Sequence, residues 1–113
     1  MQEVKYVVNL KSTYTDRLFQ AILSLKTIDE CYMFFEDVCT IQEVQEIAQR
    51  YWVACLLNEG KIYSEIVKET GASTATISRV NKCLIYGSNG YKVALEREKN
   101  NQQDTIDEEK TDE

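Results

Sequence analysis

The chain has 113 residues, a length that fits one domain, and 43% of them are hydrophobic, which is enough for a core. It holds four glycines and no proline. Sheet-rich folds need more turn residues than this, so the composition favours an all-α fold. No apolar run approaches the roughly 18 residues that span a bilayer, and no secretory signal opens the chain. We therefore expect a cytoplasmic protein with no membrane segment.

The net charge of −6 is distributed unevenly along the chain. Residues 96–113 hold eight acidic and three basic side chains, so this segment contributes −5 and the remainder only −1. Residues 61–92 hold five basic and two acidic side chains, an excess of +3. The distribution matters more than the total for a nucleic-acid partner, because binding depends on local positive charge.

The sequence offers no centre for metal binding or catalysis. There is no histidine, and the four cysteines do not form a C-x-x-C pair. We expect them to be buried free thiols in a reducing compartment, with no metal or cofactor. Without histidine, a clustered acid pair or a glycine-rich phosphate loop, no reaction centre can be assembled, so we expect a protein that is not an enzyme.

The first half of the chain predicts an N-terminal arm and three helices. Residues 1–12 form the arm, and apolar periodicity predicts helices over 14–25, 28–38 and 41–58. Each helix follows a threonine with an acid three residues later, a pattern typical of capping boxes: Thr13/Asp16, Thr27/Glu30 and Thr40/Glu43. The apolar side of the third helix is wide, which indicates a large core or a subunit interface. Gly60 is expected to end that helix.

The second half predicts a helix-turn-helix at about 62–86, within a helical domain of residues 13–99. Short helices fit 63–69 and 74–85, with Gly71 in the turn and Ser73 as a cap. A further helix fits 91–99, and residues 100–113 read as an acidic, disordered tail. The small shared core of the helix-turn-helix would consist of Ile66, Ala72, Ile77 and Val80.

The exposed face of the second helix in this motif suits DNA. Short hydroxyl side chains near its N-terminus let the backbone approach phosphates, and Arg79 has the geometry to read a guanine edge. The expected DNA-binding residues are Lys61, Lys68, Ser73, Thr74, Ala75, Thr76, Ser78, Arg79 and Lys82.

Two runs resemble a known family: LLNEG at 56–60 and TGASTATISRVNKCL at 70–84. They are similar to the Trp repressor family, and most closely to its YerC/YecD branch, as are AILSL at 21–25 and FFEDVCT at 34–40. The resemblance covers about residues 14–86. It implies six helices and an intertwined homodimer, in which each helix-turn-helix meets one half-site of double-stranded operator DNA.

The resemblance also implies an effector pocket, and two departures concern it. The Trp repressor holds tryptophan between two arginines, of which one matches Arg79 and the other falls at Gln49, next to Arg50. The glycine that follows the recognition-helix arginine in that family is Val80 here. A branched side chain would intrude on the indole slot, and a lost carboxylate partner would weaken an amino-acid ligand. We therefore expect that tryptophan is not the corepressor.

These patterns favour a transcription regulator, and a repressor is the simpler form because no activation domain is visible. The alternative is a helical protein–protein interaction module that reuses the helix-turn-helix. Salt discriminates the two, because DNA binding that releases counterions weakens steeply as salt rises, whereas an apolar protein contact changes little.

Overall fold

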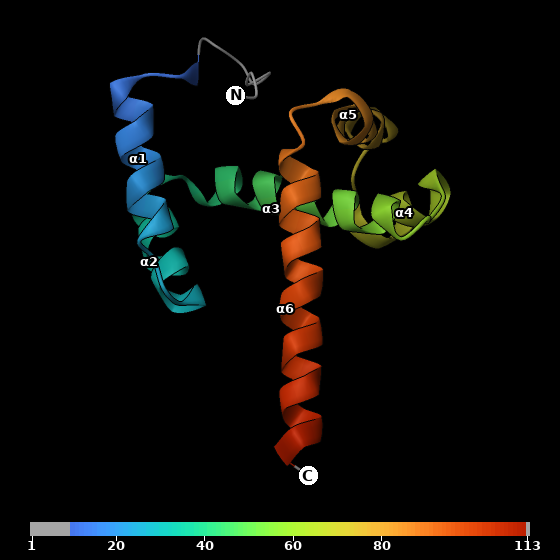
Figure 1. Cartoon of the computed structure of the whole chain (residues 1–113). Helices are drawn as coiled ribbons and strands as arrows, with labels where there is room; N and C mark the ends of the chain where they lie inside the picture. The colour runs from blue at the N-terminus through green and yellow to red at the C-terminus, as the bar shows by residue number, and fades with distance from the viewer. Residues whose placement is uncertain (1–9, 113) are drawn as a thin grey trace, which may run out of the picture. The chain divides into compact units, whose positions relative to one another are not determined.

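A computed structural model describes residues 10–112, with the side chains of residues 10–102. Within this range the structure contains six α-helices and no strand (Figure 1). The all-α prediction is therefore confirmed. The helices are α1 (Thr13–Leu23), α2 (Ile28–Val38), α3 (Ile41–Asn58), α4 (Tyr63–Thr70), α5 (Thr74–Tyr86) and α6 (Gly90–Asp112). Both ends of α2 and α3 agree with the sequence prediction.

The caps of the first three helices follow the predicted chemistry with two differences. Before α3, the predicted box is complete: Glu43 N–H donates to Thr40 Oγ1 at 3.1 Å, and Thr40 N–H donates to Glu43 Oε1 at 2.8 Å. Before α2, Thr27 Oγ1 accepts from Glu30 N–H at 3.0 Å, but the Glu30 carboxylate accepts from Lys26 N–H at 2.8 Å. That box therefore reaches one residue further back than predicted.

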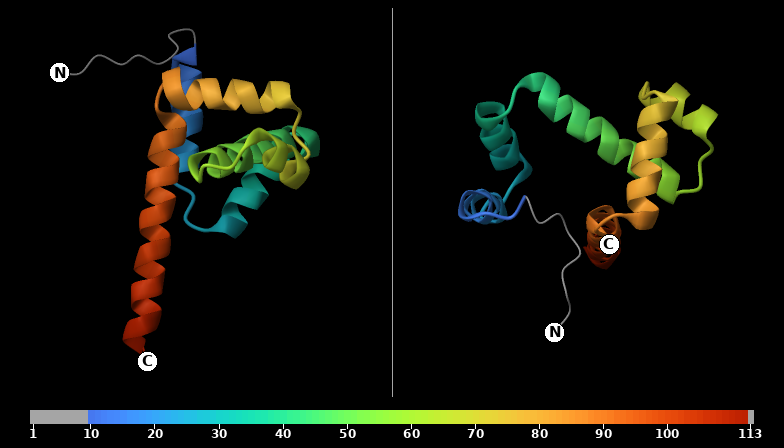
Figure 2. Two further views of the ribbon diagram at one scale, coloured as in Figure 1. Left: turned by 90° about the vertical axis from the view of Figure 1, so that its right-hand side faces the viewer. Right: turned by 90° about the horizontal axis from the view of Figure 1, so that it is seen from above.

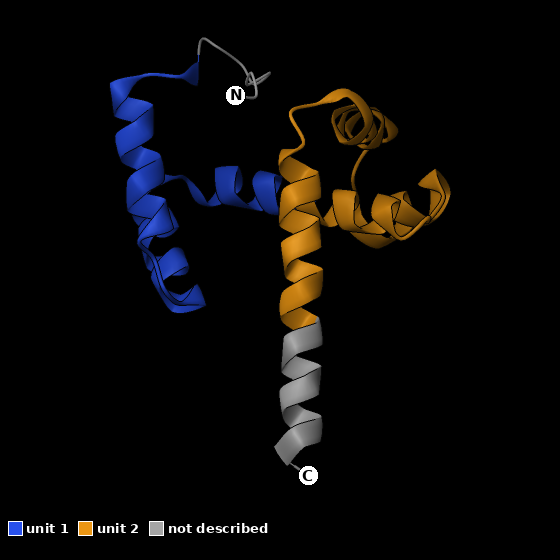
Figure 3. Cartoon of the chain, viewed as in Figure 1, with its two compact units in different colours: residues 1–49 blue, residues 50–113 orange. Residues whose placement is uncertain are grey.

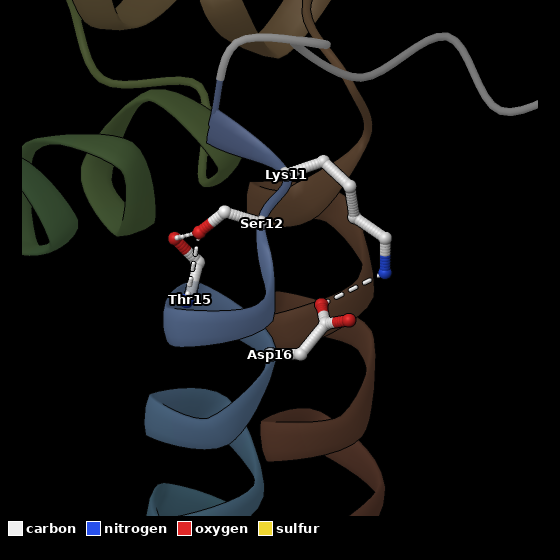
Figure 4. A network of polar contacts seen from close by, with 4 residues as sticks. All are labelled: Lys11, Ser12, Thr15 and Asp16. Carbon is white, nitrogen blue, oxygen red and sulfur yellow. Dashed lines mark hydrogen bonds and ion pairs between the residues drawn. The ribbon is translucent and has the colours of Figure 1, made fainter.

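The cap of α1 corrects the sequence prediction, because Ser12 and not Thr13 occupies it. Ser12 has an extended backbone, as a cap residue needs, and its Oγ accepts from Thr15 N–H at 3.0 Å. Lys11 Nζ also pairs with Asp16 Oδ1 at 2.8 Å beside this cap (Figure 4). Residues 1–9 of the predicted N-terminal arm lie outside the described residues.

The chain divides into two units, residues 1–49 and residues 50–113 (Figure 3). In the first unit, no described residue is buried. Large apolar side chains of α1, α2 and the start of α3 are exposed instead: Leu18, Phe19, Leu23, Ile28, Tyr32, Met33, Val38, Ile41 and Ile47. Helices as short as α1 and α2 generally depend on packing for their stability.

The second unit contains the buried core. Its members are Val53, Ala54, Leu56, Ile66, Ala72, Ile77 and Val80. The predicted core of the helix-turn-helix is therefore confirmed at all four of its positions. Along α3, Val53 is fully buried, whereas Ile47 and Trp52 are about half exposed. The wide stripe of α3 thus serves more than one surface.

The helix α3 ends at a glycine stop. Gly60 has φ +87°, and the N–H groups of Lys61 and Gly60 donate to the carbonyls of Leu56 and Leu57 at 3.1 and 3.0 Å. This is a Schellman motif, as the predicted glycine stop requires.

The helix α6 begins at Gly90 and continues to Asp112, so the structure differs from the disordered tail predicted from residue 100 (Figure 1). The prediction rested on the low apolar content of this segment. However, residues 100–112 contain no proline or glycine. Extending an existing helix costs far less than starting one, so the helix propagates past its packed part.

The cysteines also differ from expectation. All four thiols are free, but Cys31 and Cys83 are exposed, and Cys39 and Cys55 are half-buried. Cys31 lies in α2, and no residue of that helix is buried. Among the described residues, no helix combines the length and apolarity needed to cross a membrane.

Candidate nucleic-acid interface

The turn between α4 and α5 is built around Gly71. Its φ of +75° is in the left-handed region that favours glycine, and its N–H donates to the Val67 carbonyl at 2.9 Å. A Cβ at this position would meet no atom within 4 Å, so the backbone conformation alone favours glycine here. The predicted place of Gly71 in the turn is confirmed. The two helices diverge from this turn (Figure 2).

Thr70 stabilises the same turn through its side chain, a role that the sequence analysis missed. Its hydroxyl donates to the Ile66 carbonyl at 2.7 Å and accepts from Ala72 N–H at 3.1 Å. These two bonds connect the last turn of α4 to Ala72, which is buried in the core. A threonine directly before the turn glycine was the available signal, since threonine hydroxyls commonly bond to nearby backbone groups.

The start of α4 has no hydroxyl cap. The N-cap position is Ile62, and the Glu65 carboxylate accepts from its N–H at 3.2 Å. A carboxylate in the first turn also complements the helix dipole.

The start of α5 is capped by Ser73. Its Oγ accepts from Thr76 N–H at 3.1 Å, and the two hydroxyl oxygens lie 3.1 Å apart. Ser73 is exposed, whereas Thr76 is half-buried. These two predicted DNA-binding residues therefore form the cap of the helix, and their hydroxyl groups are already engaged with each other.

The remaining predicted residues of α5 form one exposed face. Thr74, Ala75, Ser78, Arg79 and Lys82 are all exposed. The opposite side of the helix carries Ile77 and Val80, at 0% and 1% exposure, which hold it against the core. Since an α-helix turns about 100° per residue, this alternation leaves a continuous solvent-facing stripe. We refer to these five residues as the α5 face.

The second unit carries further positive charge on α4 and just before it. Lys61 precedes α4 and Lys68 lies in its last turn, and both side chains are exposed. Two exposed acids of α4, Glu65 and Glu69, offset part of this charge. The segment 61–92 keeps its basic excess, so the charge agrees with a phosphate-rich partner.

The residues of the predicted effector pocket differ in their exposure to solvent. Val80 is part of the buried core, while Arg79 is exposed and Arg50 half-buried. Gln49 is half-buried and belongs to the first unit, whereas the other three belong to the second.

Tyr91 of α6 is an additional residue near the two arginines. Burial and the neighbouring Cys83 raise the pKa of its hydroxyl, and the positive charges of Arg50 and Arg79 oppose that rise. Three helices thus bring these groups into electrostatic contact. The sequence analysis missed Tyr91, because the contact depends on how α6 packs against α5.

One hollow lies in the first unit, away from the α5 face in sequence. It has a volume of about 210 Å³ and is lined by Leu10, Lys11, Thr15, Asp16 and Phe19. Lys11 and Asp16 neutralise each other across their ion pair (Figure 4). The lining therefore lacks the net positive charge that a nucleic-acid site needs.

The fold and this site define a class: an all-helical protein that carries a helix-turn-helix with an exposed second helix. The model of the Trp repressor protein family matches residues 13–99. The chain therefore belongs to the Trp repressor family, a family of DNA-binding regulators.

Individual relatives agree with this assignment. The uncharacterized protein YerC of Bacillus subtilis (strain 168) is 57% identical over 90 residues, which cover 80% of this chain and 86% of YerC. A TrpR-like protein from Eubacterium eligens ATCC 27750 superposes with a TM-score of 0.76 at 56% identity, over 79% of this chain and 92% of that one. A candidate Trp repressor from Staphylococcus aureus gives 0.78 at 41% identity, over 88% and 96%.

Proposed function

We propose that this protein is a sequence-specific transcription regulator that inserts α5 into the major groove of operator DNA. The α5 face is the observation that carries this proposal: its five residues are all exposed, three of them have short side chains, and Arg79 and Lys82 make it basic. Phosphates would meet the N-terminus of α5, where the helix dipole favours negative charge. In this proposal the bound protein represses transcription by occluding the polymerase.

The protein acts as a homodimer in this proposal. The first unit has exposed apolar side chains along α1, α2 and the start of α3, and it buries none of its described residues. One copy of the chain therefore leaves these helices without the packing that normally stabilises them. A second copy covers these faces, and its helix-turn-helix reads the second half-site, one helical turn or about 34–36 Å away.

Tryptophan is not the corepressor in this proposal. The position that would hold one carboxylate-binding arginine is Gln49, and Val80 fills core space next to the other, Arg79. Isothermal titration with tryptophan should give no heat, and operator affinity should not change when tryptophan is added. A clear increase in operator affinity with tryptophan would contradict this part of the proposal.

The first experiment is selection of purified protein against a pool of random duplex DNA, followed by titration of the enriched site at several salt concentrations. We expect a two-fold symmetric site and a steep loss of affinity as salt rises. Uniform weak binding to every duplex would contradict sequence-specific recognition. Absence of any DNA binding would instead favour the protein–protein interaction module.

The second experiment is sedimentation equilibrium of the full chain. A dimer at micromolar concentration is expected, because the exposed apolar faces of the first unit are too extensive for a stable monomer. The variant Phe19→Glu places a charge on such a face of α1 and should shift the equilibrium toward monomer. Glu36→Gln in α2, an exposed site without a large apolar side chain, serves as the control.

A further inference from the structure

Ala75 is an exposed residue in the first turn of α5. It lies on the opposite side of α5 from the buried Ile77 and Val80, and Ser78 and Arg79 flank it one turn further along the helix. Its side chain is a single methyl group. The exposed residue opposite the core side of α5 therefore has no hydrogen-bonding group in its side chain and takes little space.

The major groove presents one apolar group to such a residue. Base edges there carry hydrogen-bond donors and acceptors, together with the 5-methyl group of thymine. A methyl group pressed against a donor or acceptor removes water from that polar atom and offers nothing in return, which costs free energy. Against the thymine methyl, the same contact removes two apolar surfaces from water, which is favourable.

Two of the hydroxyl groups near Ala75 are already engaged in the helix cap. Ser73 and Thr76 bond to each other in the cap of α5, and Thr76 is half-buried. Thr74 is at the start of the helix, at the margin of the face. We propose that Ala75 packs against the 5-methyl group of a thymine in each operator half-site, and so determines part of the sequence specificity. This inference rests on the proposed function and names the chemistry that its DNA must carry.

The test replaces each thymine of the selected operator, symmetrically in both half-sites, with deoxyuridine. This change removes the 5-methyl group and leaves every hydrogen-bonding group in place. At one symmetric thymine position we expect an affinity loss of about fourfold per half-site, or about 15-fold for the full operator, as for a buried methyl group. Protein Ala75→Gly, which lacks the side-chain methyl, should show less than about a twofold loss at that same position.

Two controls keep the result specific to this contact. Ala94→Gly makes the same change at an exposed position of α6 and should retain the full deoxyuridine effect. Ala75→Ser keeps the Cβ atom, adds a hydroxyl and should also reduce the effect, while circular dichroism verifies that each variant is folded.

The outcomes separate this inference from the proposed function. A deoxyuridine effect that Ala75→Gly and Ala75→Ser suppress, and Ala94→Gly does not, supports it. Tight binding to a selected symmetric site with no such position overturns the inference and leaves the DNA-binding function standing. A protein that enriches no site overturns both.

Discussion

The hydroxyl of Tyr51 in α3 donates a hydrogen bond to Glu98 Oε1 in α6 at 2.8 Å, across 47 residues of sequence. Two helices of the second unit are thus joined by a polar contact outside the apolar core. Tyr51 is half-buried and Glu98 is exposed, so solvent weakens the bond.

Removal of this hydrogen bond should cost little stability. Tyr51→Phe and Glu98→Ala each remove one partner of the bond and are expected to lower the free energy of unfolding by about 0.5–1 kcal/mol, measured by urea denaturation. The double variant should lose less than the sum, because both changes remove the same interaction. Glu96→Gln, which removes a negative charge from the same helix, is the control and should be close to neutral. Additive losses would show that the bond does not stabilise the fold.

Stability should fall in alkaline solution. Burial raises the pKa of Tyr51, Cys55 and Tyr91, and Glu98 raises the first two further. A raised pKa means that the folded protein keeps a proton that the unfolded chain releases, so stability is complete below the unfolded pKa and is lost above it. For these groups, the decline begins near pH 8.5, the ordinary pKa of a thiol, and continues through the tyrosine range.

This pH dependence is measured as the urea midpoint between pH 7 and pH 11. Tyr51→Phe removes one of the titrating groups and should flatten the decline above pH 10. A midpoint that rises over this range would contradict the direction of the three shifts.

Replacement by alanine should change stability in opposite directions at Gly71 and Gly90, where an added Cβ would contact no other atom. Gly71→Ala forces a side chain into the left-handed region at φ +75° and should destabilise the protein by about 1–2 kcal/mol, without any steric clash. Gly90, at the start of α6, has no positive φ, and a Cβ there also meets nothing within 4 Å. Gly90→Ala should stabilise by about 0.4–1 kcal/mol. Thermal denaturation of both variants checks the pair, and equal effects would refute the role given to backbone conformation.

Truncation inside the core of the helix-turn-helix should be costly. Ile77 is fully buried, so Ile77→Ala should lower the free energy of unfolding by about 2–5 kcal/mol. Ile85→Ala makes the same change at a 55% exposed position of α5 and should stay within about 0.5 kcal/mol. Similar losses at the two positions would mean that Ile85 is covered in solution.

Arg79 and Lys82 should contribute differently to operator binding. If Arg79 reads a base edge, Arg79→Ala should cost about 1–3 kcal/mol and relax specificity at one operator position. Lys82→Ala, as the loss of a phosphate contact, should weaken binding to all sequences and lower the salt slope by about one. Lys99→Ala on α6 is the control. An equal loss across all sequences for Arg79→Ala would make that arginine a phosphate contact as well.

Local signals in the sequence determined much of this fold. The Thr40/Glu43 box, the stops at Gly60 and Gly71 and the cap at Ser73 all depend on neighbours within a few residues, so they can be recognised along the chain. The core positions of the helix-turn-helix followed from helical periodicity in the same way. The fold class and the α5 face were therefore predictable.

Tertiary structure decided what depends on residues distant in sequence. The sequence did not reveal that Val53 is buried while Trp52 is half exposed, because both faces of α3 are apolar and only packing selects between them. The Tyr51–Glu98 bond and the approach of two arginines to Tyr91 arise where α6 meets its neighbours. The exposure of the apolar faces of the first unit was also decided by the tertiary structure. Periodicity marks a face as apolar, and only the folded chain shows whether that face is covered.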